Sequence, residues 1–485
     1  DYPDLDVIRV EDTYYMVSTT MHFMPGCEIL QSFDLVHWEH ATYVYETLDH
    51  TDAQQLKSGQ NIYGQGMWAA SLRYHEGRFY ICFVANDTRK TYLYTSEKID
   101  GPWKKQLIEG FYHDGSLLFD EDGRNYIVYG NDEIWITELN EDLTAPKKDG
   151  LHRLLVSDHK NPELGYEGSH IQKINGYYYI FLIHSLRDRW MRTEACFYSD
   201  SLEGEFTGGD VLCDDRGYCG QGVAQGGIVD TPDGKWYAML FQDSGAVGRI
   251  PILVPVTWKD HFPVFGQNGH VPEEIEVHST RPEYIYQPLV GSDDFCNGLL
   301  PRWQFNHDPD PRYYHLDALQ GTYTITTREV CTELTQAVNT LTQRMSYPSC
   351  AAEVTVDASA LKEGDVAGLC ALQGCYAAVG ITKHHGKYEV LMLDKKEDGI
   401  LDMTERTVVE SHQMDFRLEA DFCNMKDEAR CYYRVNKGDW LPIGTVHKLY
   451  FKLDHFTGCR FGLFCYAAEE TGGSACFRDF KYYDV

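Results

Sequence analysis

Apolar and polar positions alternate along most of the chain, and one pattern of this kind occurs five times. A short apolar strand leads into a turn that contains Gly or Asn, and an aromatic strand follows. The clearest copy runs from Glu167 through Asn175-Gly176 to Leu182. Gly and Asn supply the positive φ that a tight turn needs, so the pattern predicts a β-hairpin. The other four copies begin at Asp4, Trp68, Asp114 and Gln225.

The spacing of these copies predicts a repeated four-stranded unit. Each hairpin is followed by further strand signals, as in Ser32–Trp38 and Ser96–Trp103. Repeats of roughly 45 to 65 residues with four strands each are typical of β-propellers, in which one repeat makes one blade. Five copies therefore predict a five-bladed β-propeller over residues 1–270.

The pattern changes after residue 270. Residues 271–293 contain Pro272, Pro282 and Pro288 but no aromatic hairpin, which indicates a linker packed on the surface. From 294 to 485 strands alternate with turns and no helical period occurs, which predicts a lectin-like or jelly-roll β-sandwich and an all-β protein. The expected strands of this domain are Ala351–Val356, Tyr388–Leu393, Phe416–Ala420, Tyr432–Val435, Lys448–Lys452 and Arg460–Cys465.

The five hairpins share one register, and this register connects fold with function. In each copy the innermost strand begins eleven or twelve residues before an aromatic residue of the next strand. Equivalent positions of a radially repeated fold lie on one ring beside the central channel. We therefore expect three carboxylates, one indole and one amide to face a single funnel: Asp4, Asp114, Glu167, Trp68 and Gln225.

Composition and charge narrow the classes of partner. The 485 residues exceed what one core usually organises, and a net charge of −31 argues against nucleic acid or an anionic membrane as a partner. No apolar run approaches the length of a membrane span of about 18 residues. The 15 cysteines lie mostly in apolar strands without C-x-x-C pairs, which favours reduced thiols and a cytoplasmic location. A segment upstream of residue 1 and a homo-oligomer both stay open.

Carboxylates gathered in a funnel with an aromatic wall suit the hydrolysis of a glycosidic bond. A single acidic residue at a strand start is most often solvated or a cap, but three in one register favour a shared task. Asp114 and Glu167 belong to adjacent blades, so their repulsion should raise the pKa of one of them, as a general acid requires. Asp4 lies across the funnel, which leaves room for a water between carboxyl groups about 6.5 to 9.5 Å apart, as inversion demands. We interpret Asp4 as the base, Glu167 as the acid and Asp114 as the group that tunes the acid.

Several consecutive motifs resemble glycoside hydrolase family 43. They are Tyr2-Pro-Asp4 followed by Tyr14-Tyr15, Pro25-Gly26, Ser32-x-Asp-Leu-Val-x-Trp38, Met67-Trp-Ala69, His113-Asp-Gly-Ser-Leu117 and Tyr166-Glu-Gly-Ser-His170. The resemblance implies a five-bladed propeller that acts by inversion on xylose- or arabinose-containing glycans. It implies the same roles for Asp4, Asp114 and Glu167, an active-site arginine at Arg249, and a substrate-facing wall of Trp68 with the loop Met21, His22 and Phe23.

The C-terminal region resembles the β-sandwich that β-xylosidases of this family append to the propeller. This implies an exo-acting enzyme that removes single xylose or arabinofuranose units from the non-reducing end of xylo-oligosaccharides or arabinoxylan fragments. Asn306–Pro311 is our candidate for the sandwich loop that reaches the funnel. Two alternatives stay open: a predominantly α-L-arabinofuranosidase activity, and a propeller lectin that binds pentose sugars without turnover.

The resemblance also raises the question of a metal. Many family members carry a histidine in the fifth hairpin that approaches a central calcium, and this chain has Gln225 there. An amide oxygen could still serve calcium. We therefore expect no required cofactor, with a structural Ca²⁺ as the open alternative.

Overall fold

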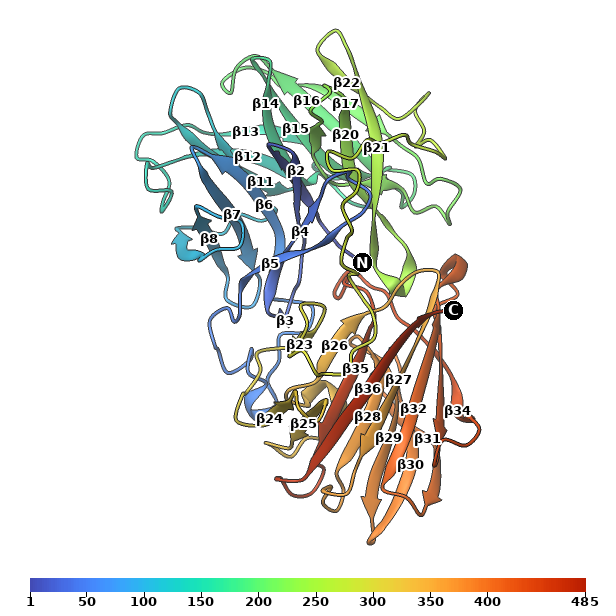
Figure 1. Ribbon diagram of the computed structural model, residues 1–485. Coiled ribbons are helices and arrows are strands. Elements are labelled where there is room, and N and C mark those ends of the chain that lie inside the picture. Colours follow the sequence, from blue (N-terminus) through green and yellow to red (C-terminus); the bar gives the residue numbers. More distant parts are fainter.

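The first domain is the predicted five-bladed propeller (Figure 1). The computed structural model describes residues 1–485. Each blade is an antiparallel sheet in which consecutive strands are hydrogen-bonded neighbours, except that β3 leaves blade one and that β18 and β19 of blade five both pair with β20. The strands of blades one to three are β1 (Asp6–Val10), β2 (Thr13–Val17), β4 (Gly26–Ser32) and β5 (Glu39–Tyr45); β6 (Met67–His75), β7 (Arg78–Ala85), β8 (Lys90–Ser96) and β9 (Lys104–Ile108); and β10 (Ser116–Phe119), β11 (Asn125–Asn131), β12 (Glu133–Leu139) and β13 (His152–Ser157).

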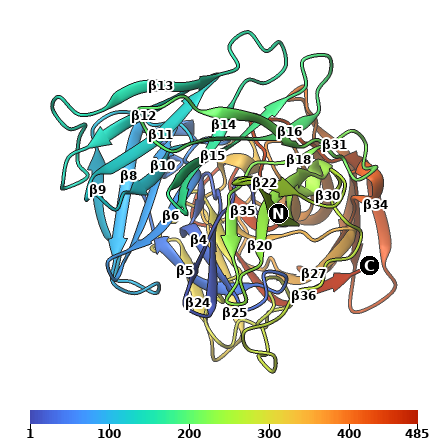
Figure 2. The same ribbon diagram turned by 90° about the horizontal axis from the view of Figure 1, so that it is seen from above.

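The last two blades close the ring. The inner strands β1, β6, β10 and β14 contact one another in this order, β1 also contacts β19 of blade five, and β16 of blade four contacts β18, so the five blades surround one channel. Figure 2 shows the blades following one another around the molecule when it is seen from above. Blades four and five consist of β14 (Glu167–Ile174), β15 (Tyr177–Ser185), β16 (Arg192–Ser199) and β17 (Thr207–Leu212), then β18 (Val223–Ala224), β19 (Ile228–Asp230), β20 (Trp236–Asp243), β21 (Arg249–Lys259) and β22 (Phe262–Phe265).

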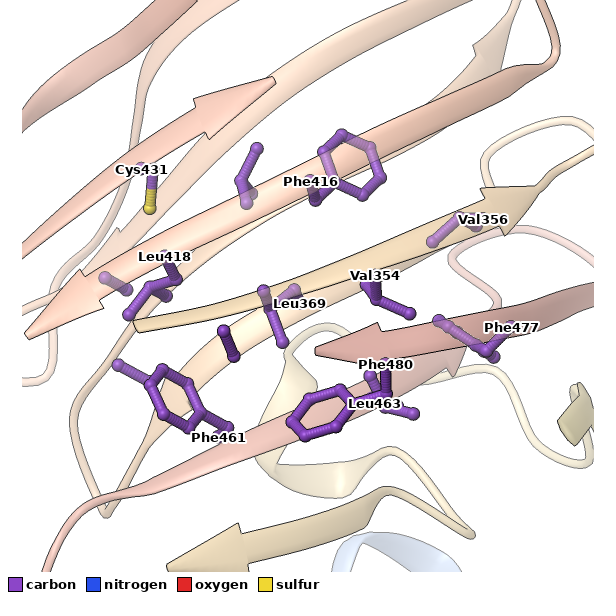
Figure 3. Packing of buried hydrophobic residues seen from close by; sticks show 14 of the residues in the cluster. Val354, Val356, Leu369, Phe416, Leu418, Cys431, Phe461, Leu463, Phe477 and Phe480 are labelled. Carbon is purple, nitrogen blue, oxygen red and sulfur yellow. The ribbon is translucent and has the colours of Figure 1, made fainter. Parts of the chain in front are cut away.

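The second domain is a sandwich of two antiparallel sheets. Apolar side chains of both inner faces meet in one core, where Val354 and Phe416 of one sheet face Leu369 and Phe461 of the other (Figure 3). One sheet has the order β3 (Phe23–Met24), β23 (Gln304–Asn306), β26 (Leu341–Arg344), β35 (Arg460–Tyr466), β28 (Val366–Leu372), β29 (Tyr376–His384), β30 (Lys387–Lys395), β31 (Leu401–Val409). The other has the order β24 (Tyr314–Asp317), β25 (Thr322–Thr326), β36 (Ser474–Asp484), β27 (Ser349–Asp357), β32 (Gln413–Asp421), β33 (Glu428–Arg434), β34 (Leu441–Lys448).

Helix is confined to four single turns of 3₁₀ type, and none of them has the length or the apolar character of a membrane span. These turns are η1 (Lys57–Gly59), η2 (Gly245–Val247), η3 (Leu334–Gln336) and η4 (Cys423–Met425). Between β22 and β23 the chain forms no strand. This segment lies against blade one, where Thr280 N donates to Phe33 O at 2.8 Å and Phe33 N donates to the Tyr286 hydroxyl at 2.8 Å.

One predicted strand is wrong. The expected strand Lys448–Lys452 is the end of β34 followed by a loop, because β34 stops at Lys448. Propeller groups hold this loop: Cys459 N donates to Ala246 O at 2.8 Å, and Thr457 Oγ1 lies 3.6 Å from Met21 Sδ. Contact with the other domain therefore replaces the sheet pairing that the local apolar pattern suggested.

The two domains share a sheet. Strand β3 leaves blade one and pairs with β23, with Phe23 opposite Asn306 and Met24 opposite Phe305. The Arg460 guanidinium lies 3.5 Å from the centre of the Phe23 ring. The segment that begins at Met21 is thus fixed in the interface between propeller and sandwich.

Three buried histidines meet at this interface. The ring centre of His22 lies 4.6 Å from that of His307 and 5.4 Å from that of His455. His22 Nε2 lies 3.1 Å from Asn306 Oδ1, and Ile62 N donates to His307 Nε2 at 3.0 Å, but both ring nitrogens of His455 lack a partner. Burial lowers the pKa of His307 to about 3 and that of His455 to about 4.

We expect acid to weaken this interface. A histidine whose folded pKa is depressed binds its proton preferentially in the unfolded chain, so its contribution is complete above about pH 6.5 and is lost as the pH falls toward the folded value. For His455 the loss amounts to about 3 kcal/mol of unfolding free energy at pH 4, since each pH unit carries about 1.4 kcal/mol. Thermal unfolding between pH 7 and 4.5 should show a falling Tm, and His455→Phe should flatten the fall.

His159→Phe is the matched control for this prediction, because His159 is exposed. Its Tm should follow the unmodified protein at every pH. Equal slopes of Tm against pH for His455→Phe and the unmodified protein would contradict the role assigned to His455.

Candidate active site

All five residues of the shared register line one cavity at the end of the central channel. The cavity has a volume of about 210 Å³. The structure thus brings together Asp4, Trp68, Asp114, Glu167 and Gln225, together with the expected Arg249. Seven further residues, not singled out from the sequence, complete the lining: His113, Asn131, Leu164, Trp190, Arg192, Leu453 and Phe456.

Unusual backbone at the inner strand starts aims these side chains into the cavity. Asp4, Asp114 and Gln225 have φ of 51°, 48° and 63°, in the left-handed region that non-glycine residues rarely adopt. In β6 and β14 the pairing register shifts directly after Trp68 and Glu167. Bulges and strained residues of this kind are frequent beside active sites, where they redirect a side chain.

The Asp4 carboxylate is held by two donors. Thr19 Oγ1 donates to Asp4 Oδ2 at 2.7 Å, and Arg249 Nη1 donates to Asp4 Oδ1. Thr19 Oγ1 in turn accepts a hydrogen bond from Ala69 N at 2.9 Å, which ties blade one to blade two. Asp4 is 4% exposed, so its orientation is set by these partners and not by solvent.

Asp114 and Glu167 lie together with His113. Gly168 N donates to Asp114 Oδ2 at 2.9 Å, and Asn131 Nδ2 donates to Glu167 Oε2 at 2.7 Å. His113 Nε2 lies 3.6 Å from Asp114 Oδ2 and 3.9 Å from Glu167 Oε2. One imidazole therefore faces both carboxylates.

The raised pKa in this cluster belongs to Asp114 and not to Glu167, the interpreted acid. The sequence predicts a raised pKa for one of the two carboxyls, and burial raises the pKa of Asp114 to about 6, with the charge of Glu167 acting in the same direction. Burial also acts to raise the pKa of Glu167, yet its contact with His113 and the charge of that imidazole outweigh burial, so this pKa is lowered. The charge of Asp114 raises the pKa of His113 to about 9. The His113 imidazole therefore decides which of the two carboxyls has the raised pKa.

A chain of buried charges runs behind the cavity. Asp243 Oδ1 accepts a hydrogen bond from Arg249 Nε at 3.2 Å, and Asp243 Oδ2 accepts one from Arg192 Nε at 2.8 Å. Through Arg249 this chain continues to Asp4. Because two guanidinium groups alternate with two carboxylates, the four charges balance.

The sandwich domain closes one side of the cavity, though not with the predicted loop. Leu453 and Phe456 belong to the loop after β34, and the Phe456 ring packs edge-on against Trp68 at 5.1 Å and lies 4.0 Å from the Arg249 guanidinium. The candidate segment Asn306–Pro311 does not line the cavity. Its first residues instead pair with β3 and contact His22.

The expected wall of Met21, His22 and Phe23 is also absent from the cavity. All three side chains are buried, because β3 is a strand of the sandwich sheet and its surroundings are rings of the second domain. Of the predicted wall, only Trp68 faces the cavity.

Four oxygens of the channel wall are bound by Arg73 and are not free for a calcium ion. Calcium takes about six to eight oxygen ligands. Here Arg73 joins several inner strands: Nη1 donates to Asp6 Oδ2 at 2.6 Å, Nε donates to Leu117 O at 2.8 Å, and Nη2 donates to Ser116 Oγ at 2.7 Å and to Ile171 O at 3.2 Å. These four oxygens are thus already bound to a side chain that carries positive charge, and this part of the channel does not fit a calcium ion.

Comparisons with known proteins agree with this geometry. The family model "Glycosyl hydrolases family 43" matches residues 1–263, and the model "Beta xylosidase C-terminal Concanavalin A-like domain" matches residues 292–483. A curated protein named beta-xylosidase, from Formosa agariphila, is 26% identical over 535 residues, which cover 98% of this chain and 87% of that protein.

Two solved structures are similar over the whole chain. A bifunctional GH43-CE protein of Bacteroides eggerthii has a TM-score of 0.93 and 42% identity over 100% of this chain, which spans 63% of that larger protein. A GH43 glycoside hydrolase with an engineered active site, which displays endo-xylanase and exo-arabinofuranosidase activity, has a TM-score of 0.90 and 27% identity, covering 100% of this chain and 98% of that one. The chain belongs to glycosyl hydrolase family 43.

Proposed function

We propose that this glycosidase is an exo-acting, inverting enzyme that releases a single pentose, xylose or arabinofuranose, from the non-reducing end of a xylan-derived oligosaccharide. The convergence of Asp4, Asp114 and Glu167 in one cavity carries the proposal. Pockets for drug-sized ligands measure about 300 to 1,000 Å³. A cavity of about 210 Å³, closed on one side by Phe456, suits one sugar unit rather than a long chain.

In this proposal Asp4 is the base. Its carboxylate is fixed by Thr19 and Arg249, so a water beside it would lose a proton to an oxygen of defined direction. Trp68 and Phe456 exclude bulk water from the same side. The neutral balance of the charge chain behind Asp4 supports a neutral sugar as substrate.

Glu167 is the proposed acid, and Asp114 with His113 holds the proton that it needs. A protonated His113 beside an ionised Glu167 carries the same total charge as a neutral His113 beside a protonated Glu167. When a sugar displaces water from Glu167, the protonated form of that carboxyl becomes more stable relative to the ionised form, because desolvation disfavours the charge. The proton can then pass from His113 to Glu167 and on to the leaving oxygen.

We expect His113 to set the alkaline limit of activity. Because the charge of Asp114 raises the pKa of His113 to about 9, the cluster should keep its proton, and kcat/KM should stay high, up to about that pH. In His113→Gln the two carboxyls must hold the proton without the imidazole, and the alkaline limb should move to lower pH by more than one pH unit. A pH series of kcat/KM measures this. An alkaline limb that stays at the same pH in His113→Gln would contradict the role proposed for His113. The control is His278→Gln, at an exposed position, which should leave the limb unchanged.

We also propose that the enzyme works without a bound metal. The Arg73 guanidinium already joins oxygens of several blades, so dialysis against a chelator should leave both kcat and Tm unchanged.

Arg73→Met leaves Asp6 without its guanidinium partner and should lower the free energy of unfolding by about 3 to 5 kcal/mol. Loss of activity on chelation that calcium restores would overturn this proposal.

Hydrolysis of nitrophenyl β-D-xylopyranoside and nitrophenyl α-L-arabinofuranoside tests the proposed function. Turnover of either substrate supports it, and the ratio of the two kcat/KM values assigns the preferred pentose. Binding of xylo-oligosaccharides in a calorimetric titration without turnover would favour the pentose-binding lectin instead. Products analysed from xylotetraose should contain single xylose units from the first turnover if the action is exo.

A further inference from the structure

Arg192 lines the cavity but has no role in the mechanism above. It begins strand β16 of blade four and is 2% exposed. Its Nε donates to Asp243 Oδ2 at 2.8 Å, while its Nη1 is buried and has no hydrogen-bond partner. Leaving a buried donor of this kind unpaired costs about 1 to 3 kcal/mol, and more for a charged group.

The surroundings hold this guanidinium in place. Asp243 is itself 2% exposed and binds both Arg192 and Arg249, so Arg192 cannot turn away without breaking the charge chain. The guanidinium carbon also lies 5.3 Å from the centre of the Trp190 ring and 5.4 Å from that of Phe241. An unpaired donor in a rigid setting beside a substrate cavity is typical of a group whose acceptor arrives with the ligand.

We infer that Arg192 is a specificity-determining residue whose guanidinium donates a hydrogen bond to one free hydroxyl of the sugar unit in the cavity. The inference rests on the proposed function and names what the site selects. Because Asp243 and Asp4 balance the charges of Arg192 and Arg249, the donor suits a neutral hydroxyl rather than a carboxylate. A sugar that lacks this hydroxyl, or carries an ester on it, leaves the buried guanidinium unpaired and is rejected.

The test compares the parent nitrophenyl pentoside with its monodeoxy analogues in the unmodified enzyme and in Arg192→Lys and Arg192→Met. In the unmodified enzyme, kcat/KM for one analogue should fall about 10- to 100-fold further than for the others. In both variants kcat/KM for the parent should fall by a factor similar to the one that the missing hydroxyl causes in the unmodified enzyme. The ratio of kcat/KM for the parent to kcat/KM for that one analogue should then approach one. The lysine side chain of Arg192→Lys is too short to place a second donor. Because its charge still pairs with Asp243, this variant keeps the test possible if Arg192→Met fails to fold.

Arg189→Met is the matched control, because Arg189 lies on the loop that precedes β16 with its side chain 59% exposed. It should discriminate between the analogues as the unmodified enzyme does. Discrimination that is the same in the Arg192 variants and the unmodified enzyme, for every analogue, would overturn the inference. If the unmodified enzyme turns over no pentoside, the proposed function fails, and titration of the same variants with xylose, arabinose and their deoxy forms still decides whether Arg192 recognises a hydroxyl.

Discussion

Glu167→Gln should lose far more activity on xylobiose than on nitrophenyl β-D-xylopyranoside. General acid catalysis contributes about 10²- to 10⁴-fold to a rate. Nitrophenolate leaves as a stable anion and needs little help from an acid, whereas the sugar oxygen of xylobiose must be protonated as the bond breaks. The ratio of the two kcat/KM values should therefore change by at least about 10²-fold in the variant.

The amide substitution tests chemistry with little disturbance of the fold. Asn131 Nδ2 donates to Glu167 Oε2, and it can donate to the amide oxygen of glutamine in the same place. Glu163→Gln, at an exposed position on the segment before β14, is the control and should leave both rates unchanged. Equal losses on the two substrates would show that Glu167 does not protonate the leaving group.

The propeller and the ring of five cavity residues could be predicted from the sequence because both follow from local spacing. The turn at Asn175-Gly176 fixes a hairpin, and a shared distance from turn to inner strand start places equivalent residues on one ring. The pattern does not show that Asp4 and Asp114 adopt positive φ or that β14 bulges after Glu167. These features arise from contacts between blades, which repeats in a single sequence do not reveal.

Contacts between the two domains could not be predicted. The apolar run Lys448–Lys452 has the alternation of a strand, yet it begins the loop that brings Phe456 to Trp68. Phe23 belongs to the first blade in sequence but pairs with the sandwich sheet. In both cases the partner is far away along the chain, and local propensity yields to packing.

The charges were predicted only in part. The sequence predicts that repulsion between neighbouring carboxylates raises one pKa; at Asp114 burial is the larger cause and the charge of Glu167 adds to it, while His113 lowers the pKa of Glu167. His113 stands directly before Asp114 in the motif that carries the family resemblance, which was the available signal. The sequence holds no such signal for Arg192, because the role proposed for it depends on an unpaired nitrogen that only the three-dimensional structure reveals.

Asp4→Asn should abolish most activity on every substrate, by about 10²- to 10⁴-fold in kcat/KM, with no dependence on the leaving group. The base acts on water and not on the departing sugar, so a better leaving group cannot compensate for its loss. The pattern is the opposite of that expected for Glu167→Gln. Proton NMR of the first product formed by the unmodified enzyme should show the inverted anomer.

Stability must be separated from catalysis in this variant, because Asp4 and Arg249 form a buried ion pair. Asp243→Asn removes the other carboxylate that Arg249 contacts, at a residue that does not line the cavity. Both variants should have a lower Tm, since each leaves a buried guanidinium short of a partner. Only Asp4→Asn removes the group that accepts the proton of water, so its activity should fall at least about tenfold below that of Asp243→Asn. Equal activities at equal Tm would mean that Asp4 serves the fold alone, and the base would have to be sought elsewhere in the cavity.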